Sequence, residues 1–100
     1  MMRLFWTPEA VQDRDEIYDH IEADNPVAAL SLDALFSDRA KHLIDHAGLG
    51  RPGRIPGTRE LIMHRNYILI YDVADDAIRV LRVVHVARQW PPVATKAARN

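Results

Sequence analysis

The sequence contains no cysteine, only two lysines (Lys41 and Lys96) and only four glycines, all of which lie between residues 48 and 57. The absence of cysteine excludes disulfide bridges, thiolate nucleophiles and cysteine-ligated metal centres. No segment approaches the roughly 18 apolar residues of a membrane helix, and "MMRLFWTPEA" lacks the longer apolar core of a secretory signal. We therefore expect a cytoplasmic protein with no membrane segment.

The composition is that of one small globular domain. The chain has 100 residues, 48% of them apolar and 27% charged, which is enough for a single core. Residues 1–50 carry four Lys/Arg and ten Asp/Glu, whereas residues 51–100 carry nine and four. This asymmetry indicates either one face suited to an acidic or phosphate-rich partner, or a chance difference between acidic helices and basic strands. We expect one domain over residues 1–100.

The N-terminal part predicts a short strand followed by a helix. "RLFW" (3–6) is apolar, Thr7 can cap a helix through its side-chain oxygen, and Pro8 suits the first helical position. Apolar residues recur at helical spacing along one stripe and polar residues fill the other side. The predicted stripe consists of Ala10, Ile17 and Ile21 with Val11 and Tyr18 beside them; the predicted solvent side consists of Asp13, Arg14, Asp15, Glu16, Asp19 and Glu22.

A second helix is predicted after "DNP". The residue before Pro26 is disfavoured in the helical region, so the first helix ends there, and Asn25 can cap the next one. The helical spacing continues to about Ala47, and Gly48 is predicted to end the helix in the left-handed conformation. The predicted apolar stripe is Ala29, Leu32, Phe36, Ala40, Leu43 and Ala47, widened by Leu35 and Ile44. The two helices form a hairpin.

The segment "GLGRPGRIPGT" (48–58) contains all the glycines and reads as a loop. A glycine-rich loop can hold a phosphate, but such loops usually run from a strand into a helix, and this one runs from a helix into a strand. An extended connector is the default interpretation.

Alternating apolar residues then predict three strands: "TRELIMH" (58–64), "NYILIYDV" (66–73) and "AIRVLRVVHVA" (77–87). Turn residues separate them, so they form an antiparallel meander. The predicted fold is α+β with the order β-α-α-β-β-β, in which the helical hairpin covers one face of a sheet that includes the N-terminal strand. Residues 92–100 are predicted to be a loosely held tail.

His42 and His46 lie four residues apart on the predicted second helix, the spacing of two metal ligands on one helix. A metal site needs a third ligand and a carboxylate base, and the sequence offers no firm candidate for either. The alternative is a solvated last turn, where histidines and Lys41 suit the negative end of the helix dipole. We therefore expect no metal and no cofactor.

The basic residues of the strands are candidates for a nuclease site. His85 could be the general acid, and Arg59, Arg65 or Arg82 could hold the phosphate. A general base is harder to find, because the acids on the strands are only Glu60 and Asp72, apart from those in the turn. The structural alternative is that the arginine stems cover the sheet and their heads pair with those carboxylates, while His85 is a hydrogen-bonded structural residue.

The alternation of side chains is a further objection to the nuclease. It places Arg79, Leu81, Val83 and His85 on one face of the last strand and Val80, Arg82 and Val84 on the other, so His85 and Arg82 do not converge unless a bulge intervenes. Trp90 follows the strand and precedes a double proline. It either folds back to plug the sheet or, beside Arg88, anchors a protein interface.

The pattern as a whole resembles the ParE branch of the RelE/ParE superfamily of bacterial type II toxins. The resemblance runs from about Leu4 to Pro91 and depends on "LFWTPEAVQDRDEIYDHI", the "GTRE" strand entry (57–60), "YILIY", the "DD" turn and the "LRVVHVARQW" ending. The matching positions include Gly57, Thr58, Arg59 and Glu60, and, in the ending, His85, Arg88 and Trp90.

The resemblance implies a small, plasmid-stabilising toxin that traps DNA gyrase in its cleaved-DNA state and is not itself a catalyst. It also implies a ParD-like antitoxin, whose C-terminal segment wraps the toxin and whose ribbon-helix-helix dimer binds operator DNA. Candidate binding residues are Arg59, Arg82, His85, Arg88 and Trp90. RelE-type members instead cut mRNA on the ribosome with a sheet face rich in lysine and arginine, and this chain departs from that pattern. A ribosome-dependent endonuclease using His85, Arg82, Arg65 and Arg59, and a non-toxic member that only binds its antitoxin, remain alternatives.

Overall fold

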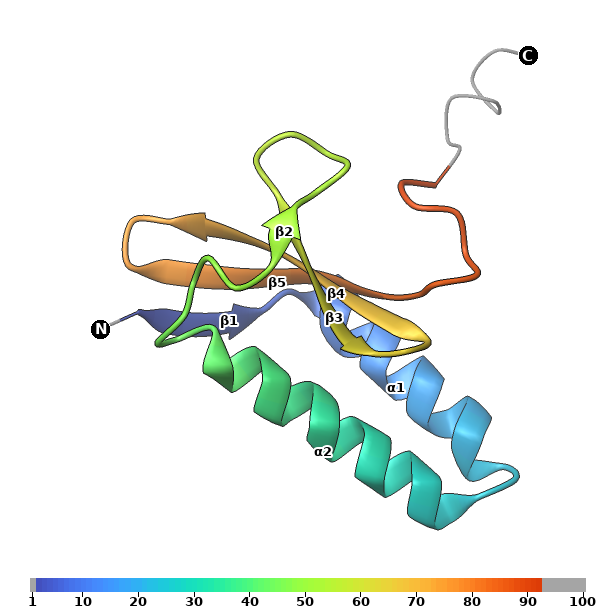
Figure 1. The fold of residues 1–100 in the computed structure, drawn as a ribbon. Coiled ribbons are helices and arrows are strands. Elements are labelled where there is room, and N and C mark those ends of the chain that lie inside the picture. Colours follow the sequence, from blue (N-terminus) through green and yellow to red (C-terminus); the bar gives the residue numbers. More distant parts are fainter. Residues whose placement is uncertain (1, 93–100) are drawn as a thin grey trace, which may run out of the picture.

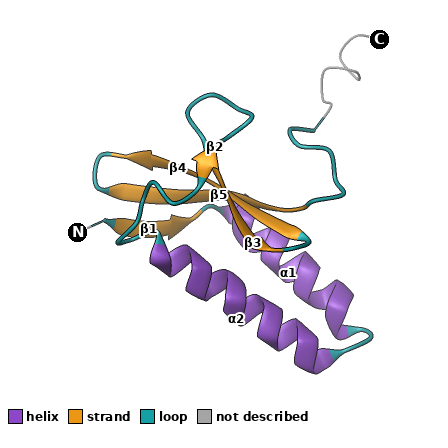
Figure 2. Ribbon diagram, viewed as in Figure 1, coloured by secondary structure: helices purple, strands orange, loops and turns teal. Residues whose placement is uncertain are grey.

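The computed structural model describes residues 2–92, so most of the predicted tail (92–100) lies outside the described residues. The fold is α+β, as predicted, with two helices packed on one face of a five-stranded sheet (Figures 1 and 2). The elements in chain order are β1 (Arg3–Trp6), α1 (Pro8–Glu22), α2 (Pro26–His42), β2 (Arg51–Pro52), β3 (Arg59–His64), β4 (Tyr67–Ala74) and β5 (Ala77–His85). Neither helix is long and apolar enough to cross a membrane.

Both helices begin as the sequence predicts. The Thr7 hydroxyl accepts a hydrogen bond from the Ala10 N–H at 3.1 Å, and the Asn25 side-chain carbonyl accepts one from the Ala28 N–H at 3.1 Å. Each cap satisfies one of the N–H groups that lack a partner inside the helix, and a proline follows each cap.

The predicted end of the second helix is wrong. α2 ends at His42, five residues before Ala47, and Gly48 is not in the left-handed region. The last turn tightens because the N–H groups of Leu43 and Ile44 donate to the carbonyls three residues earlier. This turn directs Leu43 into the core, where it is fully buried.

The strand order in the sheet is β1-β5-β4-β3-β2. The meander β3-β4-β5 is antiparallel, as predicted, and β1 joins its β5 edge in a parallel pair. The loop prediction for residues 48–58 missed β2, in which Arg51 and Pro52 pair with Glu60 and Arg59.

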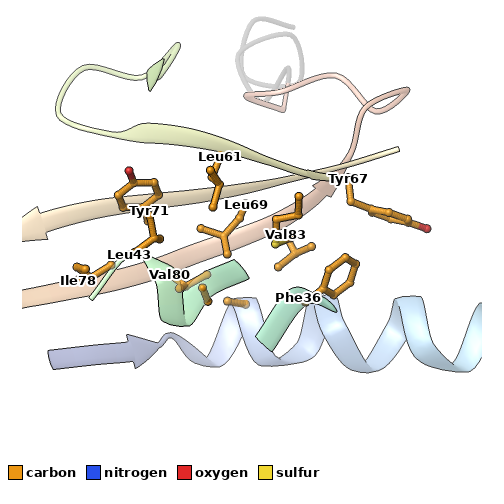
Figure 3. Packing of buried hydrophobic residues seen from close by; sticks show 12 residues of the cluster. Phe36, Leu43, Leu61, Tyr67, Leu69, Tyr71, Ile78, Val80 and Val83 are labelled. Carbon is orange, nitrogen blue, oxygen red and sulfur yellow. The ribbon is translucent and has the colours of Figure 1, made fainter. Parts of the chain in front are cut away.

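The main core lies between the sheet and the helices (Figure 3). Phe36 and Ala40 of α2 and Leu43 just after it pack there against inward-facing strand residues such as Leu69, Tyr71 and Val80. A second, smaller cluster lies on the opposite face of the sheet; it consists of Ile68, Ile70 and Val84, with Leu81 and Trp90 packed against them. We call this opposite side the open face.

A β-bulge in β5 changes the predicted alternation of its side chains. Tyr71 pairs with Val80, and the next residue toward the start of β4, Ile70, pairs with Arg82, so Leu81 is the extra residue. As a result Val80 and Val83 both belong to the main core, whereas Leu81 packs with the cluster on the open face. The prediction that Leu81 and Val83 share a face is therefore wrong.

Candidate functional site

A groove of about 320 Å³ lies between α1 and the C-terminal end of β5. Helix α1 contributes Asp13, Glu16, Ile17 and His20, and the opposite wall consists of Tyr67, Val83, His85 and Arg88. The groove is therefore lined by two carboxylates, two histidines, a tyrosine and an arginine. These groups can transfer protons or hold a polar side chain of a partner.

His85 is fixed at the end of β5 by two contacts. Its Nδ1 accepts a hydrogen bond from the Ala87 N–H at 2.9 Å, so the neutral ring carries its proton on Nε2. Its ring also packs edge-to-face on Tyr67, with centroids 5.1 Å apart. His85 thus has a structural role, and it lies at the groove with its Nδ1 already occupied.

Tyr67 lies in the same wall and is held by aromatic packing on both sides. Its ring meets Phe36 of α2 edge-to-face at 5.4 Å as well as His85. Burial raises the pKa of Tyr67 above its ordinary value of 10.0, because the phenolate would lose hydration. Tyr67 therefore enters the groove as a neutral phenol at physiological pH.

Arg82 is paired with Asp13 rather than with the acids on the strands. Its Nε and Nη2 donate to the two carboxylate oxygens of Asp13 at 2.7 and 3.0 Å. Hydrogen bonding to Asp13 raises the pKa of Arg82, so the guanidinium stays charged. Because Asp13 neutralises this charge, Arg82 is poorly suited to hold a phosphate.

The other two arginines predicted to hold a phosphate, Arg59 and Arg65, do not line the groove. Arg59 donates from Nε to the Gly50 carbonyl at 2.8 Å and from Nη2 to the Gly48 carbonyl at 3.1 Å, which fixes the loop after α2. Arg65 is exposed in the β3–β4 turn. The structure therefore does not bring Arg59, Arg65 and Arg82 together around His85. The structural alternative holds for Arg79, whose guanidinium pairs with Asp72.

Trp90 folds back onto the open face, which is the first of its two predicted alternatives, a plug of the sheet. Its ring packs against Ile68, Ile70 and Val84, and the Arg82 guanidinium lies 5.7 Å from the ring centroid. Arg88, two residues earlier, is exposed and lines the groove. Of the predicted contact pair, only Arg88 lines the groove, and the two residues meet in a smaller space on the open face.

Sequence reasoning missed the α1 side of the groove. It assigned Asp13 to the solvent side, yet Asp13 is buried and its Oδ2 also accepts from the Val83 N–H at 2.9 Å. A signal was available, because Asp13 lies three residues after Ala10 and four before Ile17, on the inward stripe. Glu16 and His20 follow on the same side of the helix.

α2 ends at His42, so His46 lies beyond the helix that was expected to carry both histidines, although its N–H still donates to the His42 carbonyl at 3.0 Å. The His42 Nδ1 instead lies 2.8 Å from the Asp38 carbonyl. Within residues 2–92, no group of three or more His, Asp or Glu side chains is placed to hold a metal ion.

The arrangement of a helical hairpin on a sheet whose N-terminal strand runs parallel to the last strand is shared with a solved toxin–antitoxin structure. The solved structure described as the chromosomal ParDE toxin–antitoxin system from P. aeruginosa matches with a TM-score of 0.78 and 34% identity. The match covers 86% of this chain and 97% of that chain.

Sequence comparison gives the family. The model of the ParE toxin of the type II toxin–antitoxin system parDE matches residues 4–90. The putative toxin Y4kP of Sinorhizobium fredii is 39% identical over 92 residues, which is 91% of this chain and 95% of Y4kP. Toxin RelE2 of Caulobacter vibrioides is 31% identical over 88% of this chain and 99% of its own length. The chain belongs to the ParE toxin family and is a type II toxin of that family.

Proposed function

We propose that this toxin acts on DNA gyrase and is neutralised by a ParD-like antitoxin. The observation that carries the proposal is the ParE family match over residues 4–90, together with the 34% identity to a protein from a ParDE system. The antitoxin would bind operator DNA through its own ribbon-helix-helix domain, so the toxin needs no DNA-reading element.

The proposed contact surface is the groove at the end of β5. Arg88 is exposed there and His85 is partly buried, with Glu16 and His20 across from them. Arg59 and Arg82 are occupied by hydrogen bonds within the domain, so we assign them structural roles and remove them from the contact surface. Exposed arginines are frequent anchors of protein interfaces, which makes Arg88 the first candidate for target or antitoxin contact.

A ribosome-dependent endonuclease is the second candidate, because one observation favours it. The groove brings Glu16 and His20 to the same surface as His85, so a carboxylate or imidazole base is present where the sequence suggested none. The open face argues against it, since it carries an apolar cluster covered by Trp90 instead of the basic face of RelE-type nucleases.

The decisive experiment measures both activities on one preparation. Purified gyrase is incubated with supercoiled DNA and the toxin, and trapped cleavage complexes are counted after detergent and protease treatment. Toeprinting on translating ribosomes reports mRNA cleavage. Trapped complexes without toeprints are the expected result. Toeprints without trapped complexes would establish the endonuclease, and neither signal, with normal growth on induction, would indicate a non-toxic member that only binds its antitoxin.

A parallel experiment addresses the partner. The toxin is co-expressed with a ribbon-helix-helix protein encoded next to it, and complex formation is measured by size-exclusion chromatography with light scattering. We expect a stable complex whose formation abolishes gyrase inhibition. We also expect the antitoxin's C-terminal segment to be acidic or amphipathic, because residues 51–100 carry nine of the 13 lysines and arginines and only four acids.

A further inference from the structure

Glu60 is a buried acid on the open face, where none of the groove residues of α1 reach it. Its side chain is 1% exposed, and it lies on β3 opposite Ile70 of the apolar cluster. A buried carboxylate needs hydrogen bonds or an opposite charge to offset its lost hydration. Both come from the loop that joins β2 to β3.

Arg54 contacts the Glu60 carboxylate in two ways. Its backbone N–H donates to Glu60 Oε2 at 3.0 Å, and its guanidinium Nε lies 3.7 Å from Oε1. Arg51 adds a bond from Nη2 to Oε1 at 3.3 Å. Glu60 therefore anchors the Arg54 backbone by a hydrogen bond and forms an ion pair with its guanidinium, on a side chain that is 49% exposed.

The guanidinium of Arg54 also reaches the C-terminal segment. Its Nη1 donates to the Trp90 carbonyl at 3.1 Å, across 36 residues of sequence. The loop and the C-terminal segment both rise on the side of the sheet away from the helices (Figure 1). Val86, Arg88 and Trp90 line one small space together with Arg54 and Glu60.

The hydrogen bond from Arg54 to the Trp90 carbonyl matters because the Trp90 indole itself lacks one. Trp90 packs on Ile68, Ile70 and Val84, but its Nε1–H is buried and has no hydrogen-bond partner among the described residues. A buried donor without an acceptor opposes docking of the ring, so apolar packing alone holds the segment less firmly than the covered area suggests. The bond from Arg54 to the Trp90 carbonyl offsets part of that loss.

We propose that Glu60 is a positioning residue, which acts through Arg54 and the Trp90 carbonyl to set the path of residues 86–92 and hence the position of Arg88 beside the groove. The functional part of this inference rests on the proposed action at the groove. The structural part, that Glu60 and Arg54 govern docking of Trp90, stands on the contacts alone.

The test uses Trp90 as its own reporter. The chain has two tryptophans, so a Trp6→Phe background leaves Trp90 as the only indole fluorophore. Glu60→Gln and Arg54→Ala are expected to shift the Trp90 emission to longer wavelength and to increase its quenching by acrylamide. Loss of a charge-assisted bond corresponds to about a ten-fold change in an equilibrium, so gyrase inhibition should need about ten-fold more toxin.

Arg51→Ala is the matched control, because Arg51 contacts the same Glu60 carboxylate but makes no hydrogen bond to Trp90. Its emission and inhibition should stay close to those of the background protein. Unchanged emission in either Glu60→Gln or Arg54→Ala would overturn the proposal, as would an equal shift in Arg51→Ala. If Glu60→Gln does not fold, as judged by circular dichroism, the exposed Arg54→Ala decides.

The two proposals fail in different ways. If the emission shifts as expected but the background protein does not trap gyrase, the link from Glu60 to Trp90 stands and the gyrase target is wrong. If gyrase is trapped equally by all variants although the emission shifts, the positioning role for Arg88 is refuted.

Discussion

Asp13 of α1 binds two neighbouring residues of β5 with one carboxylate. The carboxylate accepts hydrogen bonds from Nε and Nη2 of Arg82 at 2.7 and 3.0 Å. Its Oδ2 also accepts a hydrogen bond from the Val83 N–H at 2.9 Å. β1 pairs with β5 only as far as Val80, so the backbone beyond that point needs other partners. Two side chains supply these partners in place of further β1 residues: the Thr7 hydroxyl donates to the Leu81 carbonyl, and Asp13 accepts from Val83.

Asp13→Ala should therefore destabilise the fold by about 3 kcal/mol, because it leaves a buried N–H without an acceptor and removes the partner of a charged guanidinium. Asp13→Asn, which keeps one acceptor, should lose less. Asp15→Ala, at an exposed position of the same helix, is the control and should change stability by less than about 0.5 kcal/mol. Urea unfolding monitored by circular dichroism measures all three. Equal losses in Asp13→Ala and Asp15→Ala would contradict this role.

Gly50 is closely surrounded by the Tyr71 ring and the sheet. A Cβ at this position would lie 2.8 Å from Tyr71 Cε1 and 2.9 Å from the Glu60 carbonyl, and the Gly50 N–H donates to the Tyr71 hydroxyl at 2.8 Å. Gly50→Ala should cost about 1–3 kcal/mol, because neither neighbour can move freely. Gly48→Ala is the matched control, since its Cβ meets nothing within 4 Å. Denaturant unfolding that shows no difference between these variants would refute the packing argument.

Tyr67 should make the fold sensitive to alkaline pH. Its folded-state pKa is raised by burial above 10.0, so above that pH the unfolded chain releases its proton first and unfolding is favoured. The contribution of Tyr67 is fully present below pH 10 and is lost as pH rises through the folded-state pKa. The free energy of unfolding measured between pH 8.5 and 11 should fall less steeply in Tyr67→Phe. Parallel curves for the two proteins would show that Tyr67 is not responsible.

Arg88→Ala should reduce gyrase inhibition by about ten-fold or more while leaving the free energy of unfolding within about 0.5 kcal/mol of wild type. The reason is its position: Arg88 is exposed at the groove and contributes nothing to the core. Arg65→Ala removes an exposed arginine from the β3–β4 turn and is the matched control. Inhibition that decreases equally in both variants would indicate a general charge effect instead of a contact surface.

Local chemistry made much of the fold predictable. Thr7 and Asn25 cap helices through bonds to residues three positions away, and the meander strands alternate with clear turn residues, so the caps and strands follow from neighbouring residues. The end of α2 and the two-residue β2 were not predictable in this way. Both depend on bonds from distant residues: Tyr71 donates to the Ala47 carbonyl, and Glu60 holds Arg54 and Arg51.

The candidate site was predicted only in part. The pattern at the end of β5 identified His85, Arg88 and Trp90 as candidate site residues. It did not show that His85 and Arg88 line the groove while Trp90 packs on the open face. Leu81, the extra residue of the bulge, changes the alternation between Val80 and Arg82, and no local sequence feature marked it. Glu16, His20 and Asp13 reach the site only because α1 packs against β5.

The sequence alone determined the α+β class and the order of the elements other than β2, because periodicity, caps and turns are local properties, and its motifs carried the ParE resemblance. The tertiary structure decided which charges are available to a partner. Arg82 and Arg59 are occupied within the domain because Asp13 and the carbonyls after α2 lie within hydrogen-bonding distance once the layers pack. Trp90 is a plug because the bulge and the meander place an apolar cluster on the open face, where its indole is covered and its carbonyl meets Arg54.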